Sequence, residues 1–312
     1  MKIAYLCPFY DPAICGVKQA VKELAKRMVE KGHEVHVYTS DWDKYQRIKK
    51  KEEVIDGVYV HRCVYWFKVA NFASFWPSVF FKLLKENFNI IHTHNFGNPH
   101  VFFGALAAKL KGVPHIHTTH CPWSDAKRGF IGDFLIKSGY YNTIGRLSLK
   151  WTKEIIAITP WEIDHIKKHT RNSNIKIIPN GMDEIFFKKI KFNSFKKTYG
   201  EHKKVILFLG RFNSTKGPEK LAIAARDIVQ ERDDIVFLFI GPDEGKKEEV
   251  KEIVKNLNQV YVLEPLRNRS QIVEAYQAAD VYVLPSYREG LPLTLFEAMA
   301  SELPIVAAPV NG

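Results

Sequence analysis

The sequence predicts two doubly wound α/β domains, each built on a parallel sheet with helices on both faces. Short apolar runs rich in Val and Ile alternate with helical segments, which is typical of βαβ units. The alternation occurs in two series, separated by a Lys-rich polar stretch from Lys188 to Lys204. The 312 residues are enough for two medium domains with separate cores. We therefore expect an N-terminal domain over 1–187 and a C-terminal domain over 188–312.

The first series consists of β-strand candidates that share an apolar, β-branched composition. They are Lys2–Leu6, Glu34–Tyr38, Asn89–His92, Pro114–Thr118, Glu154–Ile158 and Ile175–Ile178. Between the first two strands, residues 17–30 carry apolar side chains at helical spacing, which predicts an amphipathic helix.

The second series repeats this pattern after the polar stretch. Its strand candidates are Val205–Leu209, Val236–Ile240, Val260–Leu263, Val281–Leu284 and Ile305–Ala307. A helix is expected over Leu293–Ala300, after the turn at residues 290–292. Ligands of open α/β sheets bind beyond the carboxyl ends of the strands, so we expect a site there, in a cleft between the domains.

The positive charge of the chain is unevenly distributed. Residues 1–200 contain 32 Lys and Arg against 17 Asp and Glu, whereas residues 201–312 contain 14 against 17, for a total of +12. This asymmetry suggests an anionic partner for the first part: nucleic acid, a membrane surface or an acidic substrate. Charge alone supports the nucleic-acid interpretation, because no helix-turn-helix, RNP or zinc motif is present.

Several protein classes lack their sequence signals here. Neither half has GxGxxG after its first strand or a Walker loop, which disfavours a nicotinamide, flavin or P-loop enzyme. The four cysteines form no CxxC pair, so we expect free thiols, no metal site and a reducing, cytoplasmic location. No stretch approaches the ~20 apolar residues of a membrane span, and we predict no cofactor.

The segment from Ser286 to Ala300 has the most specific pattern. It follows the apolar strand VYVLP, and seven residues separate Glu289 from Glu297, which lies on the following helix. A helix N-terminus after a strand favours phosphate, and carboxylates accept hydrogen bonds from sugar or ribose hydroxyls. The segment therefore suggests a nucleotide-sugar site, although two glutamates at a solvated helix start would show the same spacing.

A second segment, GRFNSTKG (210–217), supports this interpretation. Arg211 follows the first strand of the second domain, and Lys216 comes five residues later, before a helix. Two cations at a strand-to-helix turn can stabilise the charge of a diphosphate leaving group. Both segments belong to the same predicted sheet, which makes two merely exposed cations a weaker explanation.

At this point the sequence resembles the retaining glycosyltransferases of family 4, which have the GT-B fold of two Rossmann-like domains. The matching segments cover nearly the whole chain. They are GVKQAVKELAKRMVEKGHEVHVYT (16–39), NIIHTHN (89–95), HIHTTH (115–120), IIPNGMD (177–183), GRFNSTKG (210–217), AADVYVLPS (278–286) and EGLPLTLFEAMA (289–300).

The resemblance implies a role for each matching residue of the donor site. Arg211 and Lys216 would bind the diphosphate of a UDP-, GDP- or ADP-sugar. Glu289 would hold the transferred sugar, aided by backbone amides around Gly290 and Leu291. In addition, Glu297 would accept hydrogen bonds from the ribose hydroxyls.

In the first domain, the resemblance assigns Gly16 and His120. Gly16, in the loop after the first strand, would let its backbone approach the donor phosphate. His120 would lie beside the sugar at the reaction centre. The family substitutes the anomeric carbon on the face of the leaving group, and the leaving phosphate itself helps to deprotonate the acceptor.

The chain departs from the family pattern in two places. Members often carry Gly-Gly in the first loop, where this chain has Cys15 and Gly16. The chain ends at Gly312, soon after a predicted strand, whereas the resemblance implies a further segment with a last helix. The C-terminal domain would then be incomplete, which keeps a catalytically dead remnant as an alternative.

Other chemically suggestive residues have simpler explanations. Asp41-Trp42-Asp43 matches the DxD pattern of other glycosyltransferases, but we interpret it as a surface turn. The pairs His92/His94 and His115/His117 alternate along strands, which favours strand-end packing or acceptor contact over zinc. For His165 and His169 we expect a solvated helix face.

The role of residues 64–88, which bears on the acceptor, has two interpretations. The segment has eight aromatics in its first eighteen positions. They could form core packing beneath a loop, or an interfacial surface that contacts a membrane with the help of Lys127 and Arg128. We thus expect a metal-independent hexosyltransferase with a glycan or lipid-linked acceptor in cell-envelope or polysaccharide biosynthesis, peripheral on the inner membrane face. A nucleic-acid-binding protein remains the alternative from another class; an epimerase or a phosphorylase-like enzyme fits less well.

Overall fold

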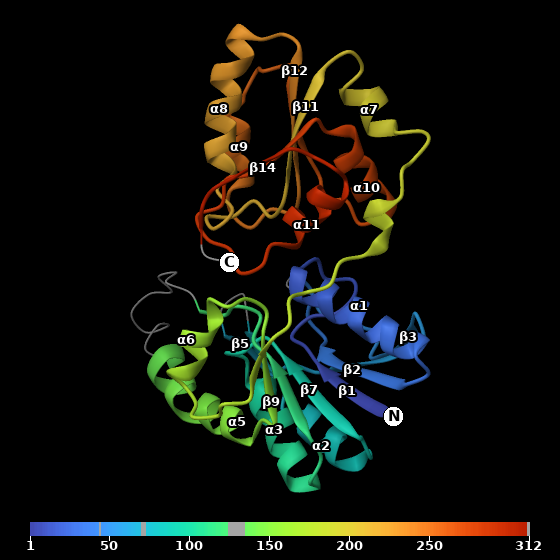
Figure 1. Ribbon diagram of the computed structural model, residues 1–312, viewed down its shortest axis with the longest axis vertical. Helices are drawn as coiled ribbons and strands as arrows, with labels where there is room; N and C mark the ends of the chain where they lie inside the picture. The colour runs from blue at the N-terminus through green and yellow to red at the C-terminus, as the bar shows by residue number, and fades with distance from the viewer. Residues whose placement is uncertain (44, 70–72, 124–134, 311–312) are drawn as a thin grey trace. The chain divides into compact units, whose positions relative to one another are not determined.

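The protein folds into two compact units, Met1–Gly181 and Met182–Gly312. This computed structural model describes residues 1–43, 45–69, 73–123 and 135–310. Each unit has a mainly parallel sheet covered by helices on both faces (Figure 1), which confirms the predicted class.

The first unit contains an eight-stranded sheet in the order β10-β9-β8-β7-β1-β2-β4-β3. Its strands are β1 (Lys2–Leu6), β2 (Glu34–Ser40), β3 (Glu52–Ile55), β4 (Val58–Cys63), β7 (Ile90–His94), β8 (His115–Thr118), β9 (Glu154–Ala157) and β10 (Ile175–Ile177). Neighbours pair in parallel except β3 and β4, which form an antiparallel hairpin. A separate antiparallel pair joins β5 (Phe67–Val69) to β6 (Ala73–Phe75).

The β3–β4 hairpin was missed in the sequence, although its turn is visible there. Asp56 and Gly57 connect the strands with φ of 52° and 78°. Two left-handed residues of the type Asp-Gly are the signature of a tight hairpin turn. The charged, half-exposed residues of β3 hid the strand from an analysis based on apolar runs.

Helices cover both faces of the first sheet. They are α1 (Gly16–Glu30), α2 (Ser78–Lys85), α3 (Pro99–Lys111), α5 (Arg146–Trp151) and α6 (Glu162–Lys167), with a π-helical segment, η1 (Leu135–Gly145), leading into α5. Val21 and Ala25 of α1 are buried against β1, β2 and β4. On the other face, Val79 and Leu83 of α2 pack with α3 and with β1 and β7.

The second unit has a five-stranded, all-parallel sheet in the order β13-β12-β11-β14-β15. The strands are β11 (Lys204–Leu209), β12 (Ile235–Ile240), β13 (Val260–Leu263), β14 (Val281–Leu284) and β15 (Ile305–Ala307). The helices are η2 (Glu184–Phe187, a 3-10 turn), α7 (Ser194–Tyr199), α8 (Pro218–Glu231), α9 (Lys247–Ile253), α10 (Arg269–Ala278) and α11 (Leu293–Ala300). Helices α8 and α9 cover one face, and α7 and α10 the other (Figure 1).

The division between the units lies before the boundary that we expected after residue 187. The side chain of Phe186 is fully buried in the core of the second unit and meets the ring of Tyr276 edge-on at 5.7 Å. Residues 182–187 therefore belong to the second unit, although they precede the polar stretch that suggested the boundary.

The aromatic segment 64–88 supplies both core and surface. Trp76, Val79 and Leu83 are fully buried, as the core interpretation predicts, whereas Trp66 and Phe81 are 70% and 62% exposed. Lys127 and Arg128 lie outside the described residues.

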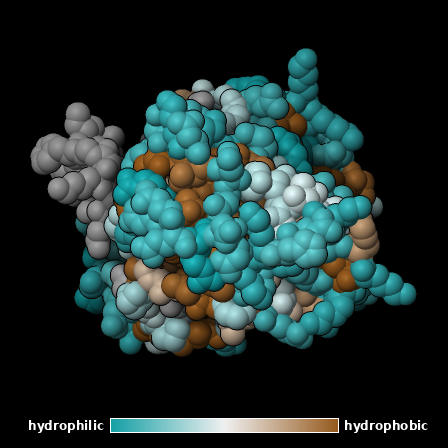
Figure 2. Space-filling model, turned by 90° about the horizontal axis from the view of Figure 1, so that it is seen from above, coloured by the Kyte–Doolittle hydropathy of each residue, from teal (hydrophilic) through white to brown (hydrophobic). Residues whose placement is uncertain are grey.

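The surface seen in Figure 2 is mostly hydrophilic, with separate hydrophobic patches. Within the described part of the chain, no helix is long and apolar enough to cross a membrane.

Candidate functional site

The predicted donor residues of the second unit gather at the carboxyl edge of its sheet. Strand β11 lies between β12 and β14. The connection after β11 carries Arg211 and Lys216, the one after β12 carries Glu244, and the one after β14 carries Glu289. Three neighbouring strand ends thus supply charged side chains to one place, as the general rule for open α/β sheets predicts.

Gly217 allows the first and last of these connections to meet. Its φ of +60° is left-handed, and a Cβ at this position would lie 2.5 Å from the Pro285 carbonyl oxygen. Beside it, the Tyr287 amide donates to the Thr215 carbonyl at 2.9 Å. A glycine is therefore required before α8, both for the backbone angle and for the close approach.

Lys216 and Glu289 form a buried ion pair across these connections. The Lys216 ammonium lies 2.6 and 2.7 Å from the two carboxylate oxygens of Glu289, and the Ser286 hydroxyl donates to the same carboxylate at 2.6 Å. The side chains are only 15% and 9% exposed. Burial lowers the pKa of Lys216, and the Glu289 carboxylate opposes this effect. Removing such a pair from water costs free energy. A contribution to the stability of the fold therefore does not by itself explain why the pair is buried.

Arg211 pairs with a carboxylate from another connection, which its spacing did not suggest. Its guanidinium donates to Glu244 at 2.8 Å, and the Asn213 amide donates to the same carboxylate oxygen at 2.9 Å. Glu244 follows β12, which is separated from Arg211 by the whole of α8, so the sequence offered no signal for this contact.

Gly290 and Leu291 form the bend that leads from Glu289 into α11. Both residues are half-buried. The helix begins at Leu293, and the amides of its first turn have no acceptor within the helix. The predicted helix Leu293–Ala300 is confirmed.

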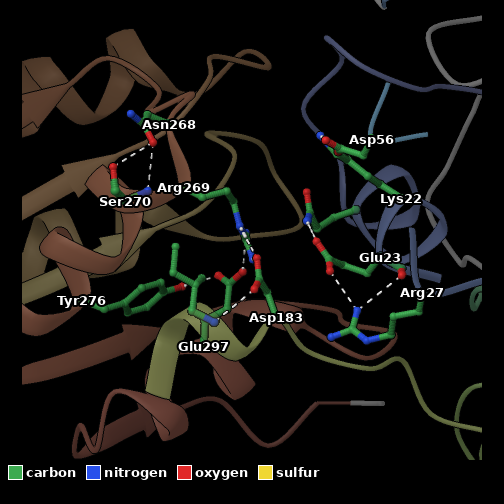
Figure 3. Close-up of polar contacts among 12 residues, drawn as sticks. Lys22, Glu23, Arg27, Asp56, Asp183, Asn268, Arg269, Ser270, Tyr276 and Glu297 are labelled. Atoms are coloured by element: carbon green, nitrogen blue, oxygen red, sulfur yellow. Dashed lines mark hydrogen bonds and ion pairs between the residues drawn. The ribbon is translucent and has the colours of Figure 1, made fainter. Parts of the chain in front are cut away.

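Glu297, in the second turn of α11, is buried among polar partners. Its Oε1 accepts from Arg269 at 3.1 Å, and its Oε2 lies 3.0 Å from the Tyr276 hydroxyl. Figure 3 shows Arg269 between the carboxylates of Glu297 and Asp183. Burial raises the pKa of Glu297, while Arg269 acts in the opposite direction. Sequence reasoning missed Arg269 and Tyr276.

His120 follows β8 in the first unit, as predicted from the sequence. Its backbone is left-handed, with φ of 57°, and its Nε2 lies 3.0 Å from Nδ1 of His94 at the end of β7. Burial lowers the pKa of His120 to about 4, so its imidazole is neutral at pH 7. The other ring nitrogen of His94 is buried without a hydrogen-bond partner in the described residues.

Glu162 holds the loop that contains His120. The carboxylate accepts hydrogen bonds from the Thr119 hydroxyl at 2.7 Å and from the amides of Cys121 and Ile158 at 2.5 and 2.6 Å. Three donors offset the burial of this fully enclosed side chain. The pattern Thr159-x-x-Glu162 resembles a helix capping box, which is the signal that could have identified it.

Gly16 is the first residue of α1 rather than part of the preceding loop. The cap is Cys15, whose sulfur accepts from the Lys18 amide at 3.4 Å. Gly16 is exposed, so its backbone can be approached by a ligand.

Two interpretations from the sequence are wrong. Asp41 and Asp43 are buried rather than on a surface turn: Asp41 pairs with Arg47 and Lys51, and Asp43 accepts from two backbone amides in its own turn. His165 and His169 are half-buried rather than solvated, because both rings stack on Trp123.

The histidine pairs of β7 and β8 are buried and hydrogen-bonded. His92 bonds Thr118, and the Thr93 hydroxyl lies within 2.9 Å of both His115 and His117. Among the described residues, no group of three or more His, Cys, Asp or Glu side chains could hold a metal ion.

Two family models match the chain over almost all of its length. The model for Glycosyltransferase Family 4 matches residues 14–185, more than half of the chain, and the model for Glycosyl transferases group 1 matches residues 189–312.

Among curated relatives, the UDP-Gal:alpha-D-GlcNAc-diphosphoundecaprenol alpha-1,3-galactosyltransferase of Escherichia coli is 31% identical over 243 residues. That alignment covers 74% of this chain but only 61% of the relative's length.

Solved structures share the fold at low identity. WaaG, a glycosyltransferase involved in lipopolysaccharide biosynthesis, is 18% identical with a TM-score of 0.74, and the alignment covers 99% of this chain and 82% of WaaG. Anabaena HepE, solved with UDP and glucose, is 18% identical with a TM-score of 0.72, covering 100% of this chain and 82% of HepE. These similarities show that each unit is a domain of a GT-B fold. The extent of the family matches shows further that the chain belongs to the group 1 glycosyltransferases of family 4.

Proposed function

We propose that the protein transfers a sugar, with retention of configuration, from a nucleotide-sugar donor to a glycan or lipid-linked acceptor of the cell envelope. The observation that carries this proposal is the buried Lys216–Glu289 pair at the carboxyl ends of β11 and β14. It rests also on the relatives, since the E. coli relative is named for a UDP-Gal donor and HepE was solved with UDP and glucose.

A nucleotide sugar offers a matching partner for each member of the pair. The ammonium of Lys216 would bind an oxygen of the diphosphate, and the carboxylate of Glu289 would accept hydrogen bonds from sugar hydroxyls. Arg211 would add a second cation on the diphosphate by exchanging Glu244 for phosphate. Because the pair already holds its charges away from water, they need little reorganisation when the donor binds.

The reaction would proceed on one face of the sugar. The acceptor oxygen forms the new bond to the anomeric carbon as the bond from that carbon to the diphosphate breaks. The acceptor proton passes to the departing phosphate oxygen, so that no separate base is needed. Lys216 and Arg211 would stabilise the negative charge that develops on the diphosphate.

His120 would contact the sugar at the reaction centre as a neutral hydrogen-bonding group. Its low pKa keeps it uncharged at pH 7, and the contact with His94 fixes its ring. The first unit would bind the acceptor. Its basic residues and the exposed Trp66 and Phe81 favour an acceptor carried on an anionic membrane, at the cytoplasmic face.

Product analysis tests this function. The protein and a lipid extract are incubated with UDP-, GDP- and ADP-sugars whose sugar is radiolabelled. Label should pass to a lipid or glycan product with its anomeric configuration unchanged, and EDTA should leave the rate unchanged. Label transfer with inversion would refute the mechanism, and no transfer from any donor would favour a remnant without activity.

A further inference from the structure

We propose that Arg269 and Tyr276 are positioning residues that hold Glu297 as an ionised acceptor for the two vicinal hydroxyls of the donor's ribose. This inference rests on the proposed function, and it names residues of the same site that the family resemblance did not identify.

The partners of Glu297 occupy only part of its hydrogen-bonding capacity. A carboxylate has about four lone-pair positions, two on each oxygen. Arg269 takes one on Oε1 at 3.1 Å, and the Tyr276 hydroxyl, 3.0 Å away, takes one on Oε2. Within the described residues these are the hydrogen bonds that Glu297 makes, so about one position remains on each oxygen. A pair of neighbouring hydroxyl groups, such as those at the 2′ and 3′ carbons of ribose, matches two adjacent acceptors.

Arg269 is itself fixed from several directions. Its Nε donates to Asp183 at 3.3 Å, and its guanidinium lies 4.6 Å from the centre of the Phe186 ring. Asp183 in turn accepts from the Ile185 amide through its other oxygen, at 3.1 Å. The guanidinium is therefore held against the Phe186 ring and between two carboxylates (Figure 3). This limits the orientations that are open to Glu297.

The arrangement also controls the charge of Glu297. The carboxyl group is buried, which raises its pKa, and the nearby Asp183 acts in the same direction. Arg269 and the Tyr276 hydroxyl act in the opposite direction, in favour of the ionised form. A protonated carboxyl has lost an acceptor position, so it cannot accept from both ribose hydroxyls and keep both protein partners. Without Arg269, protonation should begin at a higher pH.

A structural ion pair between α10 and α11 would look similar, so the test must separate the two roles. Binding of UDP, GDP and ADP is measured by calorimetry from pH 5.5 to 8, and the tightest of the three is compared with its 2′,3′-dideoxy form and with inorganic pyrophosphate. The variant Arg269→Met removes the charge but keeps a chain long enough to cover Phe186. Its control is Arg226→Met, on the exposed face of α8.

We expect Arg269→Met to weaken nucleotide binding about tenfold at pH 7, which is the effect of about one lost charge-assisted hydrogen bond. The loss should grow as the pH falls, whereas the dideoxy nucleotide and pyrophosphate bind the variant and the parent equally. Tyr276→Phe should show a smaller loss, and Arg269→Lys should restore the pH profile of the parent.

Two results would overturn the inference while leaving the proposed function in place. In one, Arg269→Met binds the nucleotide with the affinity of the parent. In the other, its affinity for the dideoxy form falls by the same factor as its affinity for the full nucleotide, which indicates a structural role. If none of the nucleotides binds the unchanged protein, the proposed function fails and this inference fails with it.

Discussion

Gly217 decides whether the two charged connections of the second unit can meet. No side chain fits between its backbone and the Pro285 carbonyl, and this contact places Lys216 against Glu289. The glycine of the GR…KG motif thus has a steric function in addition to its left-handed φ. Position 217 contributes no chemical group, yet the charged pair depends on it.

Gly217→Ala should therefore lower the free energy of unfolding by more than a left-handed backbone alone explains. Gly112 has nearly the same φ, +65°, with nothing within 4 Å of an added Cβ, so Gly112→Ala serves as the control. We expect the control to lose about 1 kcal/mol of unfolding free energy from backbone strain and Gly217→Ala about 2–3 kcal/mol. Urea unfolding measures both, and equal losses would show that the close contact is unimportant.

The residues of the donor site divide according to how far apart they lie in the chain. Arg211, Lys216, Glu289 and Glu297 were predictable because each belongs to a local motif beside a strand end. Glu244, Arg269 and Tyr276 were not, because they reach these residues only through the packing of neighbouring strands and helices. Local spacing identifies the groups that we propose bind the donor, and tertiary packing brings up the groups that contact them.

Strands β7 and β8 place an unusual number of histidines inside the first unit. Burial lowers the pKa values of the six that lie on these strands or next to them. His92 and His115 are lowered to about 3, His100 and His120 to about 4, and His94 and His117 to well below their usual range. Burial therefore keeps these rings neutral at pH 7, and they hydrogen-bond threonine hydroxyls and backbone in the neutral form.

The first unit should consequently be acid-sensitive. Well above pH 6.5, the ordinary histidine pKa, these histidines are neutral in both states and contribute nothing to the pH dependence. Below pH 6.5 the unfolded chain binds protons that the folded chain cannot, so stability falls as the pH falls toward 4. Each histidine adds up to about 1.4 kcal/mol per pH unit.

Urea unfolding at pH values from 7.5 to 5 measures this dependence. His92→Asn, which can still bond Thr118, should reduce the slope by about one proton, whereas His202→Asn, exposed in the second unit, should not. A stability of the first unit that is constant between pH 7 and 5 would contradict the account.

The position of each strand in its sheet explains which strands could be predicted from the sequence. All eleven expected strands are present, since parallel strands buried on both faces appear as continuous apolar runs. The hairpin β3–β4 and the pair β5–β6 lie at or beyond the edge of that sheet, where charged and exposed residues replace the runs.

At the scale of the whole molecule, the net charge belongs to one unit. Met1–Gly181 contains 27 basic and 15 acidic residues, and Met182–Gly312 contains 19 of each. The whole excess of +12 therefore lies in the first unit. The few cations of the proposed donor site lie in the other unit and do not account for it, so we propose an anionic membrane or acceptor as the partner of the first unit.

Vesicle flotation tests this explanation. The protein should bind anionic vesicles at low salt, bind neutral vesicles weakly, and be released as salt screens the basic residues. Replacing Trp66 and Phe81 by Ser should reduce binding, while Phe192→Ser, 69% exposed in the second unit, should not. Equal binding to neutral and anionic vesicles would exclude an electrostatic contribution.

The central claim is that the carboxyl ends of β11 and β14 bind the diphosphate and the sugar of a nucleotide-sugar donor. Calorimetric titration of UDP-, GDP- and ADP-sugars into the protein and into Glu289→Gln tests it most directly. The variant keeps the shape of the side chain but loses the charge that Lys216 pairs with. We predict that one donor class binds the parent and binds the variant at least tenfold more weakly. Binding of that donor with equal affinity to both proteins would contradict the account.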